Sequence, residues 1–407
     1  MKKVLVLGVG AQGSAAARKL QQEANVAEII CADYDQKAVE GLVAELSKAK
    51  GAFVDAHDKA SIVKAAEGVD LILNGLPLEC TQNVLEAALE AKTNYQDYAG
   101  TTSLHSDWVE NYRIQYEEYG PKFEAIGKLA LIGTGSAPGL ICAATREAVK
   151  HLDTCDTIYN IVWEGAIAKR FQPFWWSPIT ALHDMSEEGY AVIDGELVRT
   201  PAYGLPIKRQ YEYMDREIEF TEHCHDEPIH YWYSKDTLFK GVKNVYFKYA
   251  GAGMDFAKPL YRAGLLSHEK KTISGVEIAP FDVIVAHLPN PPKFKEEIQE
   301  IVNEGMEVDS GCMVIEAYGK KDGKDTLVEV HVSAPGFVES FERAGMTGEM
   351  YLTGQGGFLF SKMFVNDDFD QVGLIGSDMI TDAQVDTYFG YAKELDITLD
   401  VVVKEEK

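Results

Sequence analysis

Short apolar runs alternate with helical patterns along the first third of the chain. The runs that predict buried strands cover residues 4–7, 28–32, 52–54, 69–73, 94–98 and 129–132. Between them the spacing of apolar positions predicts helices, among them residues 36–48, 81–91 and 108–125. Strands that alternate with helices form a parallel sheet, because each crossover helix has to cover one sheet face. We therefore expect an α/β fold with a doubly wound parallel sheet over residues 1–138.

The first strand leads into a glycine-rich turn, GVGAQG at residues 8–13, and then into a helix. This is the G-x-G-x-x-G spacing in the strand, turn and helix context that dinucleotide binding requires. Gly8 permits the tight exit from the strand, Gly10 lets the backbone approach a pyrophosphate, and Gly13 lets the helix pack on the strand. The free N–H groups of the helix N-terminus attract the anion. Residues 1–138 are thus expected to form a dinucleotide-binding (Rossmann) domain.

Asp33 ends the second strand about twenty residues past the last glycine, where an acid that binds the ribose is expected. Such an acid repels a 2′-phosphate, and Tyr34 supplies no guanidinium, so we favour NAD over NADP while leaving NADP open. Ligands of these sheets lie at the carboxyl ends of the strands. The residues predicted to surround the dinucleotide are Gly8, Gly10, Ala11, Gln12, Gly13, Asp33, Tyr34, Asp55, Ala56, Asn74, Gly75, Leu76 and Pro77. Asp55 as a helix cap and Asn74 as a turn former are equally good interpretations of those two.

The pattern changes after residue 138, where aromatic residues become frequent. Alternating segments at residues 157–163, 244–249, 313–318 and 327–332 predict a mixed sheet, and Asp322-Gly323 predicts a hairpin turn. Residues 139–343 are expected to form a second α+β domain that binds substrate and carries the dimer contact. Helical patterns at 344–359 and 382–395 predict that residues 344–407 pack back on the first domain.

Composition and charge exclude several classes of partner. The formal net charge is −25, which repels nucleic-acid phosphates and anionic lipid. The sequence lacks a run of about 18 apolar residues, so no membrane-spanning helix is expected. The six cysteines have no paired spacing, which is typical of the reducing cytoplasm. The expected partner is a small molecule rather than nucleic acid or a membrane.

Several motifs together resemble the saccharopine dehydrogenase-like family. They are GVGAQG, Val-Asp-Ala at 54–56, LNGLP, ALEAKTNYQDYAG and GTGSAPGL, followed by weaker likenesses in FQPFWWSPITAL, Asp194-Gly195 and HCHDEPIH. The resemblance implies a homodimeric NAD(P)-dependent oxidoreductase that acts on the CH–NH group of an amino acid or reduces the corresponding imine. Saccharopine reductases usually carry an acid where this chain has Ala137, so the lysine 6-dehydrogenase and carboxynorspermidine dehydrogenase members are nearer. The alternatives are a carboxynorspermidine- or opine-type condensing reductase and a non-catalytic NAD(P)-binding sensor or scaffold.

Hydride transfer needs two carbons held about 3–3.5 Å apart and a group that manages a proton on nitrogen. Tyr98 and Cys80 are the candidate catalytic residues, although a bound water could carry the proton and either side chain could simply be packing. The candidate substrate-binding residues are Gly100, Thr101, Arg170, Trp176, His225 and Glu227. A substrate carboxylate calls for a guanidinium fork. We favour Arg170 for it over Arg199, Arg209 and Arg216.

His223, Cys224 and His225 raise the question of a metal. On a strand the two histidines share one face while the cysteine points away, so a four-ligand site would need partners from elsewhere and no metal is expected. We interpret His225 and Glu227 instead as a polar pair that lines the substrate cleft and binds an ammonium or relays a proton.

Overall fold

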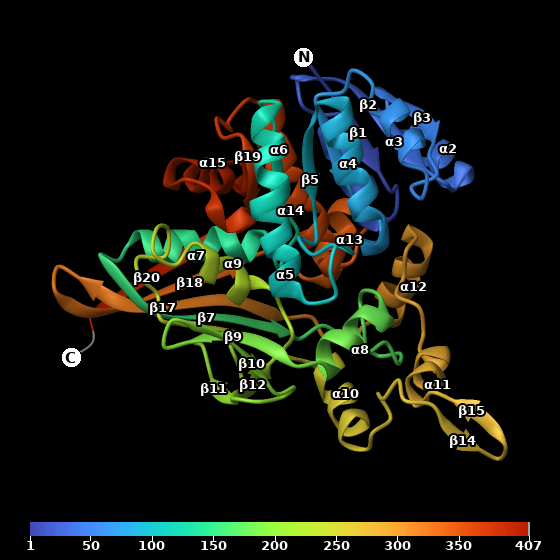
Figure 1. Ribbon diagram of the computed structural model, residues 1–407. Coiled ribbons are helices and arrows are strands. Elements are labelled where there is room, and N and C mark those ends of the chain that lie inside the picture. The colour runs from blue at the N-terminus through green and yellow to red at the C-terminus, as the bar shows by residue number, and fades with distance from the viewer. Residues whose placement is uncertain (406–407) are drawn as a thin grey trace. The chain divides into compact units, whose positions relative to one another are not determined.

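The computed structural model describes residues 1–405 and divides the chain into two compact units, each assembled from two stretches of sequence (Figure 1). The first unit comprises Met1–Lys150 and Met350–Thr398. The second comprises His151–Glu349 and the stretch that begins at Leu399. The chain therefore leaves the first unit, builds most of the second, and returns to the first.

The first unit is built on a seven-stranded sheet in which all neighbouring strands are parallel. Its order is β19-β6-β5-β4-β1-β2-β3, so the direction of winding reverses beside β1, where ligands of such sheets bind. The strands are β1 (Lys2–Leu7), β2 (Val26–Asp33), β3 (Ala49–Phe53), β4 (Leu71–Asn74), β5 (Asn94–Asp97), β6 (Leu129–Ile132) and β19 (Gly373–Gly376). The predicted doubly wound sheet is confirmed, and β19 adds a strand that the sequence analysis did not predict.

Helices cover both faces of this sheet (Figure 1). They are α1 (Ala11–Leu20), α2 (Gln36–Glu45), α3 (Lys59–Ala65), α4 (Thr81–Ala91), α5 (Trp108–Arg113), α6 (Gly120–Ala125), α7 (Leu140–Lys150), α14 (Gly348–Val365) and α15 (Asp382–Ala392). The long helix predicted over residues 108–125 is interrupted by a π-helical stretch, Ile114–Tyr119. Pro121 follows it in the first turn of α6, and a proline has no N–H to continue the α-helical ladder.

The second unit is built on a nine-stranded mixed sheet, as predicted for this part of the chain. Its main path is β10-β9-β13-β7-β17-β18-β20, and β12 joins β13 to β11. The strands are β7 (Thr154–Glu164), β9 (Gly189–Ile193), β10 (Glu196–Thr200), β11 (Ile207–Arg209), β12 (Ile218–Glu222), β13 (Asn244–Gly251), β17 (Gly311–Lys321), β18 (Lys324–Ser333) and β20 (Thr398–Glu405). Asp322 and Gly323 both have positive φ, 52° and 76°, as a two-residue hairpin turn requires.

Helices and two small sheets complete the second unit. The helices are α8 (Pro178–Ser186), α9 (Glu227–Tyr233), α10 (Ala252–Arg262), α11 (Pro280–His287), α12 (Lys295–Glu304) and α13 (Phe337–Ala344). The small sheets pair β8 (Ile167–Ala168) with β16 (Met306–Val308), and β14 (Lys271–Ile273) with β15 (Val276–Ile278). Among the residues described here, no helix has the length and apolar content needed to cross a bilayer.

The helix predicted over residues 344–359 corresponds to α14, which begins only at Gly348 because Gly345 ends the preceding helix, α13. Gly345 has φ +68° and ends α13 in the left-handed conformation that commonly closes a helix. The next helix, α14, carries glycines at 354, 356 and 357. A Cβ on Gly357 would overlap the ring of Tyr98, and one on Gly356 would lie 2.7 Å from the carbonyl oxygen of Gly135. The glycines of α14 therefore let this helix pack closely on the loops that follow β5 and β6.

Candidate cofactor and substrate sites

The glycine turn of the first unit has the geometry of a phosphate-binding loop. Gly8 has φ +83°, and a Cβ there would lie 2.7 Å from the carbonyl oxygen of Gly75. A Cβ on Gly13 would collide with the carbonyl oxygen of Gly8. A Cβ on Gly10 would meet nothing within 4 Å. Two of the three glycines are thus required by the packing of the backbone itself, whereas the third keeps open the space in front of the turn.

The N-terminus of α1 opens on the same space. Its cap residue, Gly10, has no side chain to bond the first amides, and the first turn contains no acid. Uncapped N–H groups at a helix N-terminus carry partial positive charge and attract anions. The turn and the helix together therefore form a cradle that fits the diphosphate of a dinucleotide.

Asp33 stands at the end of β2 and fixes the glycine turn. One carboxylate oxygen accepts a hydrogen bond from the amide of Val9 at 2.9 Å, and the other accepts from the amide of Asp35 at 3.0 Å. Tyr34 beside it is 76% exposed. The acid is thus oriented by the backbone at the place where the sequence predicts a ribose contact.

The loops after β3 and β4 are ordered by their own polar side chains. Asn74 accepts from the amide of Leu76 at 3.1 Å, as the turn interpretation requires. Asp55 accepts from the amide of His57 at 3.0 Å, while Asp58 is the residue that caps α3. Gly75 donates its N–H to the carbonyl of Leu7 at 2.8 Å, which ties this loop to the end of β1. The remaining members of the predicted dinucleotide set in these loops, Ala56 and Pro77, lie beside them in the chain.

Tyr98 and Cys80 both lie in the first unit. The hydroxyl of Tyr98 donates to the carbonyl of Gln12 at 3.1 Å, and burial raises the pKa of this phenol. Cys80 precedes α4, and burial together with the carboxylates of Glu79 and Asp55 raises the pKa of its thiol. At neutral pH both groups keep their protons. Tyr98 thus holds the backbone of the glycine turn through its hydrogen bond to Gln12.

Asp97, at the end of β5, organises the loop that carries the predicted substrate residues Gly100 and Thr101. One of its carboxylate oxygens accepts from the amides of Gly100 at 2.9 Å and Gly133 at 2.8 Å. The other accepts from the hydroxyl of Tyr95 at 2.8 Å. Thr101, which follows Gly100, is buried. The candidate substrate residues of the first unit are therefore held by a buried carboxylate rather than left mobile.

His225 and Glu227 form the pair that the sequence predicts, and they lie in the second unit. The Nδ1 atom of His225 is 2.6 Å from the carboxylate of the fully buried Glu227, and the imidazole stacks on Phe247 with ring centroids 4.0 Å apart. Burial by itself lowers the pKa of His225, but the carboxylates of Glu227, Asp226 and Asp184 outweigh it and raise the pKa to about 9. His225 is thus an imidazolium at neutral pH.

The same residues contain a possible set of metal ligands. Ligand atoms of His225, Asp226 and Glu227 lie within 4.8 Å of one another. The Nδ1 atom of His225 also lies 2.6 Å from the carboxylate of Glu227, so the same three residues form an ion pair.

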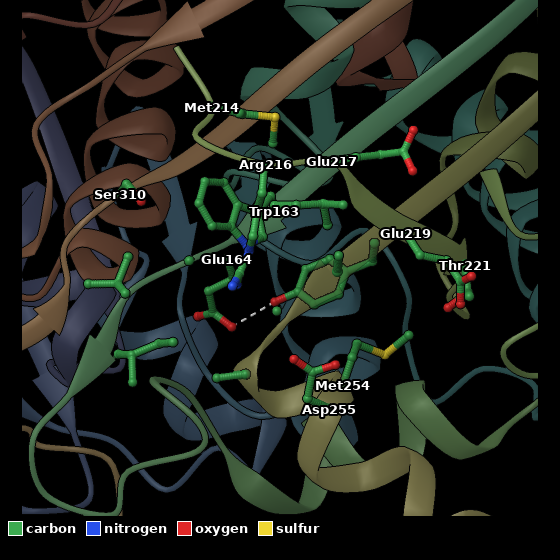
Figure 2. Close-up of a pocket in the computed structure, with 18 of the residues that line it drawn as sticks. Trp163, Glu164, Met214, Arg216, Glu217, Glu219, Thr221, Met254, Asp255 and Ser310 are labelled. Atoms are coloured by element: carbon green, nitrogen blue, oxygen red, sulfur yellow. Dashed lines mark hydrogen bonds between the residues drawn. The ribbon is translucent and has the colours of Figure 1, made fainter. Parts of the chain in front are cut away.

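The four arginines considered for a substrate carboxylate differ in what they already bind. Arg170 donates to Glu304 at 2.6 Å, and Arg209 forms two bonds to Glu316 at 2.8 and 2.9 Å. Arg199 lies over the ring of Tyr190 at 4.2 Å. Within the part of the chain that the structure describes, Arg216 has no ion-pair partner. Arg216 lines a cavity of about 420 Å³ in the second unit (Figure 2). Arg170 and Trp176 are not among the residues that line this cavity.

Comparison with known proteins identifies the first unit. Residues 4–131 match the family described as the saccharopine dehydrogenase NADP binding domain. The first unit carries a saccharopine dehydrogenase-type NADP-binding domain. The predicted family resemblance is therefore confirmed, and with it NAD(P) as the cofactor and the class of NAD(P)-dependent dehydrogenases.

Two relatives match this chain along most of their own length. Carboxyaminopropylagmatine dehydrogenase of Synechocystis is 25% identical over 396 residues, which is 92% of each chain. Carboxynorspermidine synthase of Vibrio alginolyticus is 25% identical over 359 residues, which is 81% of each chain. In both cases the similarity extends past the saccharopine dehydrogenase-type domain into the second unit.

Solved structures show the same fold at lower sequence identity. Saccharopine dehydrogenase (L-Glu forming) of Saccharomyces cerevisiae superposes with a TM-score of 0.71 at 14% identity, covering 99% of this chain and all of that one. Homospermidine synthase of Legionella pneumophila, solved in complex with NAD, has a TM-score of 0.67 at 11% identity and covers 100% of this chain and 91% of that one.

Proposed function

We propose that this protein is an NAD(P)-dependent oxidoreductase of CH–NH bonds, and that its substrate carries both a cationic amine and a carboxylate. The observation that supports this most directly is the open space in front of Gly10, at the uncapped N-terminus of α1 in the NADP-binding domain. The names of the two relatives that match most of the chain favour a carboxylated polyamine, as in the carboxynorspermidine-type alternative, over lysine or saccharopine.

The residues of the first unit hold and orient the cofactor in this proposal. The amides that open α1 bind the diphosphate, and Asp33, fixed by Val9 and Asp35, accepts from the ribose hydroxyls. The bound nicotinamide gives or takes the hydride. Gly100 and Thr101, held by Asp97, face the reacting end of the cofactor. Because Tyr98 is bonded to Gln12, we assign the proton on nitrogen to solvent rather than to this phenol.

The proposal extends to the setting of the enzyme. We propose that residues 139–343 supply substrate binding and the contacts of a homodimer, and that Met350–Thr398, which lie within the predicted segment 344–407, complete the cofactor domain. The glycines of α14 that pack on the β5 and β6 loops support the second part. All six cysteines are buried and none of them forms a disulfide, which supports a reducing cytoplasm.

The test separates an enzyme from a nucleotide-binding sensor. Calorimetry with NAD, NADH, NADP and NADPH first measures cofactor binding to the full chain. Reduction of NAD or NADP is then followed with lysine, saccharopine and carboxynorspermidine, and the reverse reaction with amine and carbonyl pairs. We expect turnover with the carboxylated polyamine. Tight cofactor binding without turnover across this panel would favour the sensor, and no binding of any of the four nucleotides would contradict both.

A further inference from the structure

The second unit contains a cavity of about 420 Å³ (Figure 2). Every residue that lines this cavity belongs to the second unit. Its walls come from the carboxyl ends of β7 and β13, from residues 213–219, and from the first turns of α10. β7 and β13 are parallel neighbours, so their carboxyl ends open at one edge of the sheet. The cavity is thus a property of the fold of this unit.

The lining is rich in carboxylates, only some of which are neutralised by the protein. The acids are Glu164, Asp215, Glu217, Glu219 and Asp255. Glu219 accepts from Lys258 at 3.4 Å, and Glu217 pairs with Lys208 at 3.2 Å. Glu164 is bonded to Tyr249, and burial raises its pKa, which favours its neutral form. For Asp215 and Asp255 the described residues provide no ion-pair partner within 4 Å, although the charges of Lys258 and Arg216 act on Asp255. The cavity therefore presents two carboxylates to a ligand, and an ammonium is the ligand group that satisfies them.

A single guanidinium, which forms no ion pair within 4 Å among residues 1–405, faces the same space. Arg216 follows Asp215 in the loop before β12 and is close enough to Asp255 to act on its charge. A guanidinium binds a carboxylate through two parallel hydrogen bonds, a geometry that an ammonium cannot offer. The cavity therefore combines acceptors for a cation with one donor fork for an anion.

Aromatic side chains line the space between these charges. Trp163, Tyr203 and Tyr249 contribute their rings, and Tyr249 donates to Glu164 at 2.7 Å, the bond drawn as a dashed line in Figure 2. The hydroxyl of Tyr203 is buried and has no hydrogen-bond partner among the described residues. A buried hydroxyl without a partner is costly to the folded protein. Rings of this kind also pack well against methylene chains and ammonium groups.

We propose that this cavity binds an aliphatic amine that also bears a carboxylate, with the ammonium on Asp255 and Asp215 and the carboxylate on Arg216. The inference rests on the proposed function only for the claim that this ligand is the substrate. It assigns the binding of the anionic group to Arg216 instead of Arg170, whose guanidinium is bonded to Glu304.

The experiment uses two probe ligands that differ only in a carboxylate, lysine and 1,5-diaminopentane. Their binding to the full chain, saturated with NAD or NADP, is measured by calorimetry. Arg216→Met should weaken lysine about 10-fold and leave 1,5-diaminopentane within about 2-fold, because only lysine has the group that the fork binds. Asp255→Asn should weaken both ligands about 10-fold. Arg262→Met is the control. Arg262 is an exposed arginine on α10, the helix that carries Asp255, but it lies outside the cavity, so this variant should change the Kd of neither ligand.

The outcomes are distinguishable from those of the proposed function. Equal losses for both ligands in Arg216→Met, an effect of Arg262→Met as large as that of Arg216→Met, or no heat with either ligand on the unaltered protein would each overturn the cavity assignment. Thermal unfolding of each variant confirms that it is folded. Cofactor binding and turnover, measured on the same samples, report on the oxidoreductase itself. If the unaltered protein binds cofactor and turns over substrate while the cavity variants keep the unaltered Kd values for both ligands, the cavity assignment is rejected and the proposed function stands.

Discussion

Replacing Gly10 by alanine tests the cofactor site with little disturbance of the fold. A Cβ at this position meets nothing within 4 Å, and the residue has φ −67°, which any amino acid adopts. The stability of the free protein should therefore change little. The added methyl group fills the space through which the diphosphate approaches the amides of α1, so its effect should appear only when the nucleotide binds.

The size of the effect follows from the hydrogen bonds at stake. A hydrogen bond to a charged group contributes about 1.5–3 kcal/mol. Pushing the diphosphate outward by the radius of a methyl group breaks at least one such bond, and about 1.4 kcal/mol corresponds to a tenfold change in Kd. We therefore expect Gly10→Ala to weaken NAD(H) and NADP(H) alike by about 10- to 100-fold, because both carry the same diphosphate.

Two further glycines complete the design. Gly41 lies exposed within α2 with nothing within 4 Å of a Cβ, so Gly41→Ala should raise the stability by about 0.5–1 kcal/mol and leave the Kd unchanged. Gly13→Ala should fold poorly, because its Cβ would collide with the carbonyl oxygen of Gly8. The assay is calorimetry with each nucleotide beside thermal unfolding. If the Gly10→Ala protein has the same Tm as the unaltered protein and the same Kd for each nucleotide, the placement of the diphosphate is refuted.

Three other predictions concern single side chains. Asp33→Asn keeps an oxygen for the amide of Val9 but removes the charge, so the ratio of the Kd values for NAD and NADP should rise about 10-fold; an unchanged ratio would contradict the ribose role. Tyr98→Phe removes only the bond to Gln12, so kcat should fall by less than about 10-fold, whereas a proton-donating phenol would lose about 10²- to 10⁴-fold. Burial outweighs the bond from Tyr249, the Glu349 carboxylate adds to it, and together they raise the pKa of Glu164 from 4.5 to about 8. The folded protein disfavours this charge, so the stabilisation is complete below pH 4.5 and is lost as the pH rises through 8. At pH 5 the Glu164→Gln variant should therefore unfold at nearly the same temperature as the unaltered protein. At pH 9 the variant should unfold at a higher temperature, with a free energy of unfolding larger by at most about 5 kcal/mol. A difference that does not grow with pH would contradict this.

The features that the sequence predicts well are those encoded in neighbouring residues. The first strand, the glycine turn and Asp33 follow from apolar runs, glycine spacing and one acid at a fixed distance. The seventh strand, β19, was missed because it contains two glycines in four residues and pairs with β6, more than two hundred residues earlier in the chain. Its strand character comes from its neighbour rather than from its own residues.

The choice among the arginines shows the same limit. Arg170 finds its carboxylate 134 residues further along the chain and Arg209 finds one 107 residues away, so no local pattern reveals that either guanidinium is occupied. The acids that surround Arg216 likewise come from β7, from the loop before β12 and from α10. Sequence spacing supplies candidates for such a site, but only the tertiary fold shows which candidate retains free donors.

The route of the chain between the two units has a consequence for biosynthesis. The first unit waits for Met350–Thr398, and the sheet of the second waits for β20, which starts at Thr398 and pairs with the outer side of β18. Both units therefore become complete almost together during synthesis, once β20 is available. Until then the nascent polypeptide displays the unpaired edge of β18, a surface prone to pair with other chains. Deletion of β20 should accordingly reduce solubility during translation more than it reduces nucleotide affinity.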